Sequence, residues 1–436
     1  MKFEKVCILG LGYIGLPTAS MFATHGVRVL GVDTNLEIIE ILKSGRIHIH
    51  EPGLGQAVEQ AVKSGNLSLS STPEPADAFI IAVPTPFYEH DLGQYNGQSY
   101  KKADMRAVTS AAEALVPHLR KGSLVVLEST SPPRTTTDLL VPILEKSGLK
   151  AGLDFYVVYS PERVLPGQIL RELVENARVI GGLTPESAQA GSDLYANFVR
   201  GEIHQTDATT AEMVKLMENT YRDVNIAVAN EFARLAERFG VDVWEAIKLS
   251  SLHPRVKILS PGPGVGGHCI SVDPWFFVET APDLSLLIQR ARQVNDAQPG
   301  FVVELVKRAL GNLAGKKIAA LGLAYKPDVD DLRESPAVEV VHLLQREGAI
   351  VKAFEPFKPD ARLPGVDAAP NLAQAVAEAD ALLLLVNHTE FRQLNPETLK
   401  AMTRARVLID TVNGWDGQNF TGEGFSLFRL GVGEKA

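Results

Sequence analysis

The chain has 436 residues, of which 45% are hydrophobic and 22% charged, and it carries a formal net charge of −9. This length is too great for one core, and the composition is that of a globular protein rather than a disordered one. The acidic balance argues against a nucleic-acid partner. The first residues do not resemble a signal peptide, and no apolar run is long enough to span a membrane. With only two cysteines, we expect a cytoplasmic protein without disulfides.

A glycine-rich turn follows the first apolar run. Residues 5–15, KVCILGLGYIG, place Gly10, Gly12 and Gly15 in a G-x-G-x-x-G pattern, and a second apolar run then ends at Asp33. In this order Gly10 permits a tight turn, Gly12 admits a pyrophosphate to the helix N-terminus, and Gly15 lets helix and strand pack closely. Because Asp33 would bind ribose hydroxyls, the pattern predicts an NAD site and favours NAD over NADP. The alternative is a glycine turn that binds nothing.

Three further apolar runs end in polar residues that we expect at one edge of a sheet. Helical segments at 104–119 and 134–147 separate them, which favours a parallel sheet covered on both faces. Ligands of such sheets lie beyond the carboxyl ends of the strands, so Thr85, Thr130 and Glu162 are expected at the mouth of a site. For a single threonine, a turn or helix cap is an equal alternative. The runs are 77–86, 123–130 and 155–162.

The stretch 209–239 contains no proline or glycine and has apolar residues at helical spacing. With Gly240 as C-cap, it predicts a helix of about 30 residues, ~45 Å long, which could run out of one domain and support another. Lys215, Asn219 and Arg222 lie at i, i+4 and i+7 and therefore project from one face. That face is either a solvated polar surface or a polar site directed at a ligand.

The loop 260–276, SPGPGVGGHCISVDPWF, surrounds Cys269 with glycines and prolines. Such a loop folds tightly, lets the backbone approach a ligand closely and presents a thiol. We interpret Cys269 as a covalent nucleophile, and the alternative is a structural cysteine in a glycine turn. Cys7 lies inside the first apolar run and is expected to be buried.

The last third of the chain repeats the strand rhythm of the first. Helical sequence at 284–313 ends near Gly315 and precedes a second doubly wound pattern. The first turn of that pattern, at 322–325, lacks the dinucleotide glycines, so we expect it to bind something other than a second dinucleotide. Lys326 and Arg333 follow beside carboxylates and either form surface ion pairs or face phosphates. The strand-like runs are 316–327, 349–356, 379–388 and 405–411.

A thiol beside an NAD site can take a primary alcohol through two oxidations. Hydride loss gives an aldehyde, thiolate addition gives a thiohemiacetal, and a second hydride loss gives a thioester that water hydrolyses to a carboxylate. Cys269 is the candidate nucleophile, and Lys215 and Asn219 would stabilise the oxyanion. Asp273 would help manage protons, and Glu162 would orient or activate the hydrolytic water. No metal is expected, because the histidines form no ligand-spaced cluster.

These residues lie in runs that resemble the UDP-glucose/UDP-mannose dehydrogenase family over nearly the whole chain. In that family the cysteine is the nucleophile, the lysine and asparagine hold the reacting oxygen, and two NAD are consumed in turn. The resemblance implies dimers across the central helix, with an arginine of the partner completing the site, a role that we assign to His253-Pro254-Arg255. The runs are GLGYIGLP at 10–17, VPTP at 83–86, EST at 128–130, PER at 161–163, K-x-x-x-N at 215–219, GGHC-x-x-x-D at 266–273 and K-P-x-x-D-D-x-R-E-S-P at 326–336.

The patterns and the resemblance together predict an α/β fold with two Rossmann-like doubly wound domains joined by a long central helix. We expect an NAD-binding domain at 1–206, a central helical segment for dimerisation and catalysis at 207–312, and a UDP-sugar-binding domain at 313–436. Thr130 is counted with the catalytic residues as well as with the cofactor contacts. Besides the three glycines, the resemblance implies NAD contacts at Tyr13, Ile14, Asp33, Thr85, Thr130 and Arg333. It implies UDP-sugar contacts at Arg163, Val164, Lys215, Asn219, Arg222, His253, Arg255, Gly266, Tyr325 and Lys326.

His268 and the VDPWF ending of the cysteine loop look like the UDP-N-acetyl-D-mannosamine dehydrogenases of the family. The expected reaction is therefore the NAD-dependent four-electron oxidation of the C6 hydroxymethyl of UDP-N-acetyl-D-mannosamine. UDP-N-acetylglucosamine 6-dehydrogenase and UDP-glucose 6-dehydrogenase are the alternatives. Asn413 stands where many relatives have Lys or Arg, which puts a sugar-nucleotide contact from the last loop in question. A two-electron hydroxyacid dehydrogenase or a non-catalytic NAD or nucleotide-sugar sensor is more remote, because neither needs Cys269.

Overall fold

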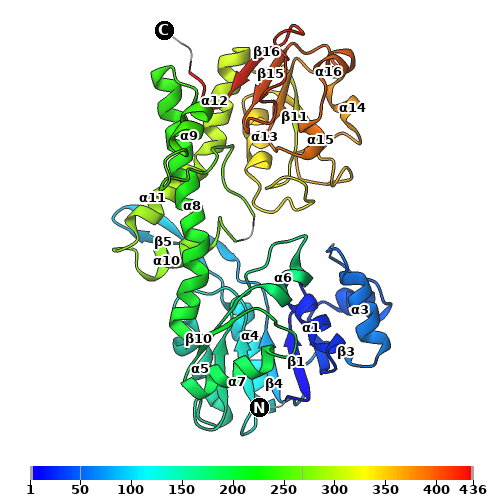
Figure 1. Ribbon diagram of the computed structural model, residues 1–436, viewed down its shortest axis with the longest axis vertical. Coiled ribbons are helices and arrows are strands. Elements are labelled where there is room, and N and C mark those ends of the chain that lie inside the picture. The colour runs from blue at the N-terminus through cyan, green and yellow to red at the C-terminus, as the bar shows by residue number, and fades with distance from the viewer. Residues whose placement is uncertain (1–2, 50, 268, 434–436) are drawn as a thin grey trace. The chain divides into compact units, whose positions relative to one another are not determined.

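The computed structural model describes residues 3–49, 51–267 and 269–433 (Figure 1). The chain divides into two compact units, each built on its own sheet. Unit 1 comprises the chain up to Glu218 together with Trp275–Ser285, and unit 2 comprises Asn219–Pro274 and the chain from Leu286 onward. In the described ranges, no helix is both long and apolar enough to cross a membrane.

Unit 1 contains an eight-stranded sheet in the order β10-β9-β8-β7-β4-β1-β2-β3. All neighbouring pairs are parallel except β8 and β9, which are antiparallel. The predicted strands around 5–9, 28–33, 77–86, 123–130 and 155–162 are confirmed, whereas β3, β9 and β10 were not predicted. The strands are β1 Lys5–Leu9, β2 Arg28–Val32, β3 Leu67–Ser70, β4 Ala78–Ile81, β7 Leu124–Leu127, β8 Tyr156–Tyr159, β9 Arg178–Gly182 and β10 Ile203–Asp207.

Helices cover both faces of this sheet, because the central strands are apolar on both sides. One core lies between the sheet and α1, α3, α6 and α7, and a second lies between the sheet and α4 and α5. The helices are α1 Gly15–Thr24, α2 Leu36–Lys43, α3 Leu54–Lys63, α4 Arg106–Leu115, α5 Val141–Leu144, α6 Ile169–Glu175 and α7 Pro185–Tyr195.

An antiparallel hairpin that was not predicted follows the VPTP run. It consists of β5 Phe87–Tyr95 and β6 Gln98–Ala103 and packs on α10 Asp273–Thr280. The rings of Phe87 and Phe276 meet edge to face with centroids 5.8 Å apart. The Ala103 N–H donates to Glu279 at 2.8 Å. The hairpin therefore holds the helix that follows the cysteine loop, within unit 1.

The predicted long helix is confirmed as α8, Ala208–Phe239, drawn in green in Figure 1. It ends where Gly240 adopts a φ of 68° and the Val241 N–H donates back to the Ala236 carbonyl at 2.9 Å. The remaining helical prediction needs a correction, because 284–313 forms two helices rather than one. Pro299, near the start of the second, begins a new helix, and Gly311 rather than Gly315 ends it. The two are α11 Leu286–Asp296 and α12 Gln298–Leu310.

Unit 2 contains a six-stranded, wholly parallel sheet in the order β13-β12-β11-β14-β15-β16. In both units the first strand pairs with the second and with the strand that opens the other half of the sheet, which is the doubly wound arrangement. The α/β prediction is thus confirmed. The strands are β11 Lys317–Leu321, β12 Ile350–Phe354, β13 Asp367–Ala368, β14 Ala381–Leu384, β15 Val407–Asp410 and β16 Ser426–Arg429; the other helices are α9 Val243–Ser250, α13 Pro336–Arg346, α14 Leu372–Val376, α15 Thr389–Arg392 and α16 Pro396–Met402.

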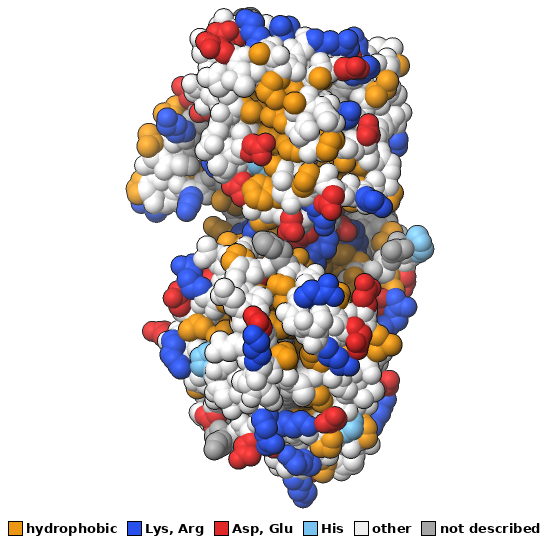
Figure 2. Space-filling model, turned by 90° about the vertical axis from the view of Figure 1, so that its right-hand side faces the viewer, with side chains coloured by type: hydrophobic (Ala, Val, Ile, Leu, Met, Phe, Trp, Pro, Cys, Tyr) orange, Lys and Arg blue, Asp and Glu red, His pale blue; other side chains and the backbone are white. Residues whose placement is uncertain are grey.

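On the face drawn in Figure 2, Lys and Arg side chains are interspersed with Asp and Glu. Over the whole chain, 52 acidic residues outnumber 43 Lys and Arg. The positive charge that functional sites need must therefore come from individual residues in defined places.

Candidate functional site

The turn between β1 and α1 has the geometry that its glycines predict. Gly10 has a φ of 92°, and its N–H donates to the Val32 carbonyl at 2.8 Å. A methyl group on Gly15 would lie 1.8 Å from the Gly10 carbonyl oxygen, so helix and turn touch there. A methyl group on Gly12 would meet no protein atom within 4 Å. The fold therefore requires glycine at positions 10 and 15, whereas the space in front of Gly12 is open.

The N-terminus of α1 and Asp33 border this open space. The residue before the helix, Ile14, provides no side-chain cap, and no acidic residue lies in the first turn. Asp33 follows β2, and its carboxylate accepts the N–H groups of Leu11 and Asn35, both at 2.9 Å. Tyr13 and Ile14 are half-buried beside them. Uncapped helix amides, open space at Gly12 and a fixed carboxylate fit the pyrophosphate and ribose of NAD.

The predicted polar residues at the carboxyl edge of the sheet in unit 1 do lie together. The Thr85 hydroxyl donates to the Thr130 carbonyl at 2.7 Å, which joins the loops after β4 and β7. These loops are neighbours because β4 and β7 pair in the sheet. Glu162 follows β8, the next strand, and its side chain is 8% exposed.

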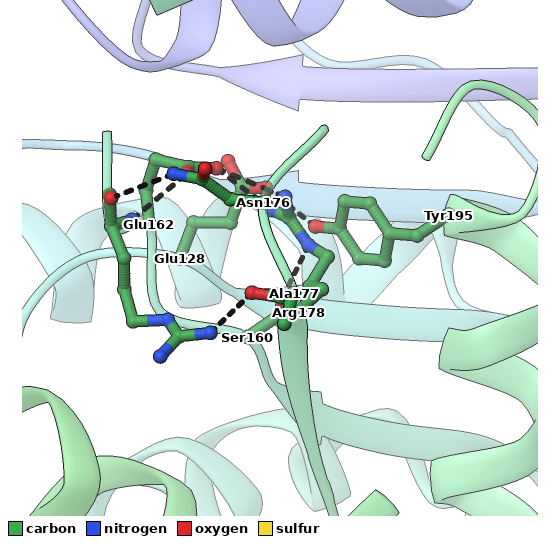
Figure 3. A network of polar contacts seen from close by, with 8 residues as sticks. Glu128, Ser160, Glu162, Asn176, Ala177, Arg178 and Tyr195 are labelled. Atoms are coloured by element: carbon green, nitrogen blue, oxygen red, sulfur yellow. Dashed lines mark hydrogen bonds and ion pairs between the residues drawn. The ribbon is translucent and has the colours of Figure 1, made fainter. Parts of the chain in front are cut away.

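Glu162 belongs to a polar network that sequence reasoning missed (Figure 3). One of its oxygens accepts the Arg163 N–H at 2.8 Å, and the other accepts two N–H groups of Arg178 at 3.0 Å. Arg163, an expected substrate contact, pairs its guanidinium with Glu218 at 2.7 Å and donates to the Ala177 carbonyl. Val164 is half-buried against the core of unit 1.

Lys215 lies on α8 within unit 1 and is 8% exposed. Across the described part of the chain its ammonium has neither a hydrogen-bond acceptor nor a carboxylate partner. The ammonium nitrogen is not among the fully buried side-chain atoms that lack a partner, so the stem of Lys215 is buried while its tip is accessible. An accessible cation on a buried stem suits a ligand-facing group, and it equally suits a solvated tip.

Asn219, one turn along α8, lies in unit 2 and connects three of the predicted residues. Its side chain is 1% exposed, its amide nitrogen donates to the Asp273 carboxylate, and its amide oxygen accepts from Arg222. Asp273 is itself 1% exposed and is the first residue of α10. These three side chains therefore form one hydrogen-bonded cluster.

Cys269 lies within one turn of this cluster. The N–H groups of Val272 and Asp273 donate to the Cys269 carbonyl at 3.0 and 2.8 Å, so the loop turns directly into α10. Cys269 is half-buried and is not disulfide-bonded. His268, which suggested the sugar, lies outside the described residues.

The glycines of the cysteine loop pack against protein. A methyl group on Gly266 would lie 2.5 Å from the Glu334 carbonyl, and one on Gly264 would lie 2.9 Å from Pro336. Gly267, with a φ of 83°, would meet the Tyr325 ring at 2.8 Å. The close approach expected of these glycines is therefore to the loop after β11, and it places Tyr325 beside Cys269.

The loop after β11 carries three of the predicted contacts, Tyr325, Lys326 and Arg333. Burial raises the pKa of Tyr325 to about 12, and the nearby Asp331 and Cys269 act in the same direction. Arg333 pairs with Asp331 at 2.7 Å. The ammonium of Lys326 lies 5.9 Å from the centre of the Tyr325 ring.

Three further residues of unit 2 were singled out in the sequence. His253 and Arg255, assigned to a role across a dimer, are exposed. Asn413 has a φ of 51°, which Asn tolerates better than most residues, and its side chain accepts a hydrogen bond from Arg429 at 3.1 Å. In the described ranges, no three His, Cys, Asp or Glu side chains are grouped to hold a metal ion.

The site residues thus divide between the units. Gly10, Gly12, Gly15, Asp33, Thr85, Thr130, Glu162 and Lys215 lie in unit 1, whereas Asn219, Arg222, Gly266, Cys269, Asp273, Tyr325, Lys326 and Arg333 lie in unit 2. Sequence reasoning missed Glu128, Arg178 and Tyr195 around Glu162. Glu128 opens the EST run at 128–130 but was given no role, and the signal for Arg178 was the apolar run after it, which resembles any short strand.

Comparison with known proteins assigns the three parts of the chain to one family. Residues 4–199 match the NAD binding domain of the UDP-glucose/GDP-mannose dehydrogenase family, residues 209–297 its central domain, and residues 319–417 its UDP binding domain. The family description names GDP-mannose where the resemblance above named UDP-mannose.

Individual relatives match over nearly full length. The UDP-N-acetyl-D-mannosamine dehydrogenase of Methanocaldococcus jannaschii is 46% identical over 99% of this chain and 98% of its own. The NDP-N-acetyl-D-galactosaminuronic acid dehydrogenase of Ralstonia solanacearum is also 46% identical, over 96% of this chain and 98% of its own. The solved structure of the UDP-D-ManNAc dehydrogenase of Pyrococcus horikoshii has a TM-score of 0.89 and 40% identity, covering 99% of this chain and 100% of that one.

Proposed function

The chain belongs to the UDP-glucose/GDP-mannose dehydrogenase family, as an NAD-dependent UDP-sugar dehydrogenase, and from that premise we propose that its substrate is UDP-N-acetyl-D-mannosamine. The proposed reaction oxidises the C6 hydroxymethyl to a carboxylate with two NAD. The observation that carries the four-electron chemistry is the cluster of Asn219 and Asp273 next to the half-buried thiol of Cys269. A two-electron hydroxyacid dehydrogenase would have no use for that thiol.

The proposed role of the β1–α1 turn is to hold the cofactor. The amides at the start of α1 would bind the pyrophosphate across Gly12, and Asp33 would bind the ribose hydroxyls. Thr85 and Thr130, joined by a hydrogen bond, would line the adjacent strand ends. Bound NAD supplies the hydride acceptor for each of the two oxidations.

Cys269 is the proposed nucleophile. Its thiolate forms a C–S bond to the C6 aldehyde carbon, and the carbonyl oxygen takes the negative charge. Loss of the second hydride leaves a Cys269 thioester at the acid oxidation level. Lys215 and Asn219 are proposed to stabilise the oxyanion, since Lys215 is a largely buried residue whose ammonium has no partner among the described residues, and Asn219 is a buried amide donor. Asp273, which accepts from Asn219, would orient that amide and help move protons.

Glu162 is proposed to serve the last step. Water adds to the thioester carbonyl, the C–S bond breaks, and the thiolate leaves as the carboxylate forms; the proton of the water passes to the Glu162 carboxylate. The contacts of Glu162 hold its carboxylate in one orientation, since it accepts three N–H groups and is only 8% exposed.

The identity of the sugar rests on the relatives. Those named for UDP-N-acetyl-D-mannosamine match over nearly full length, and one named for an N-acetyl-D-galactosaminuronic acid matches equally well. The N-acetylhexosamine class is therefore better supported than the configuration at any one carbon. UDP-N-acetylglucosamine and UDP-glucose remain the alternatives.

Steady-state and end-point assays test the proposal together. We expect NADH formation to be fastest with UDP-N-acetyl-D-mannosamine when it is compared with UDP-N-acetylglucosamine and UDP-glucose, and the yield to approach two NADH per sugar. A yield near one would refute the four-electron route, and a faster alternative sugar would reassign the substrate. Cys269→Ser should lose net turnover, because the oxygen ester route lacks the thiolate nucleophile.

We also propose a functional division of the chain and a homodimer or higher homo-oligomer. The division is cofactor binding by 1–206, dimerisation and catalysis by 207–312, and UDP-sugar binding by 313–436. An apolar stripe on α8 supports assembly with a second copy: Tyr221, Phe232, Leu235 and Phe239 are 69%, 41%, 44% and 71% exposed at spacings that keep them on one face. The exposed His253 and Arg255 are proposed to reach the partner's substrate. The cytoplasm is the proposed compartment, in keeping with two thiols and no disulfide.

A further inference from the structure

The network around Glu162 exists because one strand of unit 1 runs against the others. β9 is antiparallel to β8, with Val158 opposite Gly182 and Tyr159 opposite Gly181. The first residue of β9, Arg178, therefore lies at the edge of the sheet where β8 ends and Glu162 follows. A parallel β9 would have put Arg178 at the opposite edge.

Arg178 is buried and uses all three guanidinium nitrogens on this edge. Its Nε donates to the Ser160 hydroxyl at 3.0 Å, and both Nη atoms donate to one oxygen of Glu162 at 3.0 Å. Nη2 also donates to Glu128 at 3.0 Å. Figure 3 shows these side chains converging from the ends of neighbouring strands. An arginine with donors in a fixed planar fork holds its partners in one geometry, which a lysine cannot do.

The guanidinium of Arg178 is also fixed by contacts with Tyr195 and Glu128. Its guanidinium stacks on the ring of Tyr195, 3.8 Å from the ring centre, and the Tyr195 hydroxyl donates to Glu128 at 2.5 Å. Glu128, directly after β7, has no exposed side-chain surface, and its second oxygen has no hydrogen-bond partner among the described residues. Two carboxylates and one guanidinium thus share a buried site.

Burial and the neighbouring charges act most strongly on Glu128 and Arg178. Burial raises the pKa of Glu128 to about 7, Arg178 opposes that shift, and the charge of Glu162 adds to it. Burial alone would lower the pKa of Arg178, but Glu162, Tyr195 and Glu128 outweigh it and raise the pKa. A small pocket, lined among others by Pro161, Glu162 and Arg178, leaves this end of the network accessible.

We propose that Arg178, anchored by Glu128 and Tyr195, is the positioning residue that fixes the Glu162 carboxylate for hydrolysis of the thioester. The inference rests on the proposed function, and it assigns to the network only the last step, in which Glu162 takes a proton from the attacking water. Arg178 itself touches neither the water nor the thioester. Loosening it should slow deacylation and leave both oxidations intact, because those use Cys269, Lys215 and Asn219.

The test is Arg178→Lys, which keeps the charge and loses the fork. We expect deacylation to slow on the order of tenfold or more, because small misplacements of a catalytic group have effects of that size. Stopped-flow absorbance, with the UDP-sugar that the wild type oxidises fastest, should then show a burst approaching two NADH per site before a slow steady state. Acid quench and mass spectrometry should find the sugar acid on Cys269.

Hydroxylamine separates positioning from general damage. It attacks the thioester directly and releases Cys269 as the thiol, with a hydroxamate as product, so no activated water is required. We expect it to restore steady-state turnover of Arg178→Lys toward the wild-type rate. A slow variant with neither a burst nor rescue would show that Arg178 is only structural, and a variant with wild-type turnover would overturn the proposal directly.

Two further variants keep the test decisive if Arg178→Lys does not fold. Tyr195→Phe keeps the stacked ring and removes the hydroxyl that donates to Glu128. It should give a smaller burst, and hydroxylamine should restore its steady-state turnover as well.

Arg292→Lys is the matched control, because Arg292 is 2% exposed and pairs with Asp223 and Asp296 in unit 2. It should lose stability without accumulating acyl-enzyme; a burst in this control, or none in Tyr195→Phe, would refute the assignment. Failure of the proposed function is distinguishable, since the wild type would then not yield two NADH per sugar.

Discussion

Lys215 is a buried cation for which the described chain supplies no counter-charge. We predict that Lys215→Met lowers turnover on the order of a hundredfold, because the oxyanion loses its charged donor. The free energy of unfolding should change little, since the accessible ammonium has no partner among the described residues and the apolar chain that replaces it has a similar length. NADH kinetics and urea unfolding measure the two effects. An effect confined to the apparent KM would instead reassign Lys215 to substrate binding.

Glu128 should make stability depend on pH. Its pKa is raised by burial from 4.5 to about 7, so the folded state binds this proton more tightly than the unfolded state does. Its stabilising contribution is therefore complete below about pH 4.5 and is lost as the pH rises through about 7. Between about pH 5 and pH 8 the wild type should lose up to roughly 3 kcal/mol more than Glu128→Gln. Denaturant titrations at both pH values measure the free energy of unfolding. If it changes equally with pH in the wild type and in Glu128→Gln, Glu128 is ionised throughout this range.

At the scale of elements, the glycines of the β1–α1 turn have two different roles. Gly15 is required for the packing of the fold, whereas Gly12 is expected to be required for cofactor binding. Gly12→Ala adds a methyl group that meets no protein atom, so stability should change by less than about 0.5 kcal/mol while the KM for NAD rises. Gly15→Ala places its methyl group 1.8 Å from the Gly10 carbonyl and should unfold or severely destabilise the protein. Thermal melts and NAD titrations distinguish the two. A Gly12→Ala variant with unchanged NAD affinity would locate the pyrophosphate elsewhere.

The apolar stripe on α8 makes a separate prediction about assembly. Phe232→Glu places a charge within the stripe and should shift the protein to monomers in sedimentation velocity. Leu153→Glu is the control, since Leu153 is an apolar residue of unit 1 that is 88% exposed and far from α8 in sequence. An unchanged sedimentation coefficient for Phe232→Glu would remove the stripe from the interface.

At the scale of the whole molecule, two similar sheets use their equivalent acids differently. Gly322 repeats the geometry of Gly10, with a φ of 91° and an N–H that donates to the Phe354 carbonyl at 2.9 Å. The acid after β12, Glu355, accepts the N–H groups of Leu323 and Ala324 at 2.7 and 2.9 Å, and the same carboxylate oxygen lies 3.1 Å from His388 Nε2. Buried at 2% exposure, Glu355 is not placed to bind a ribose as Asp33 can.

One NAD should therefore bind per chain. Isothermal titration of the wild type with NAD, without sugar, is expected to give a stoichiometry near one, and Gly12→Ala should weaken that single binding event. A stoichiometry of two would show that the turn at Gly322 also accepts a dinucleotide. Titration with UDP should give a second class of site that Gly12→Ala leaves unchanged.

Much of the architecture could be predicted because it is encoded locally. The turn of Gly10, Gly12 and Gly15, the uninterrupted run that becomes α8, and the Cys269 loop each carry their signal within a short window. The prediction for 284–313 was wrong in one detail, because the region forms two helices. The sequence around Pro299 did not show that a new helix begins there, since the helical spacing continues on both sides of it. The hairpin β5–β6 was missed because its polar residues do not form an apolar run.

The sequence by itself determined the doubly wound fold, the NAD turn, the long helix and the thiol, because spacing, turn residues and apolar runs specify local backbone structure. Only the tertiary structure decided which distant groups meet. The antiparallel direction of β9 brings Arg178 to Glu162, and the packing of the cysteine loop brings Tyr325 to Cys269. The direction and neighbours of a strand follow from sheet pairing across the whole unit, and no short stretch of sequence contains that information.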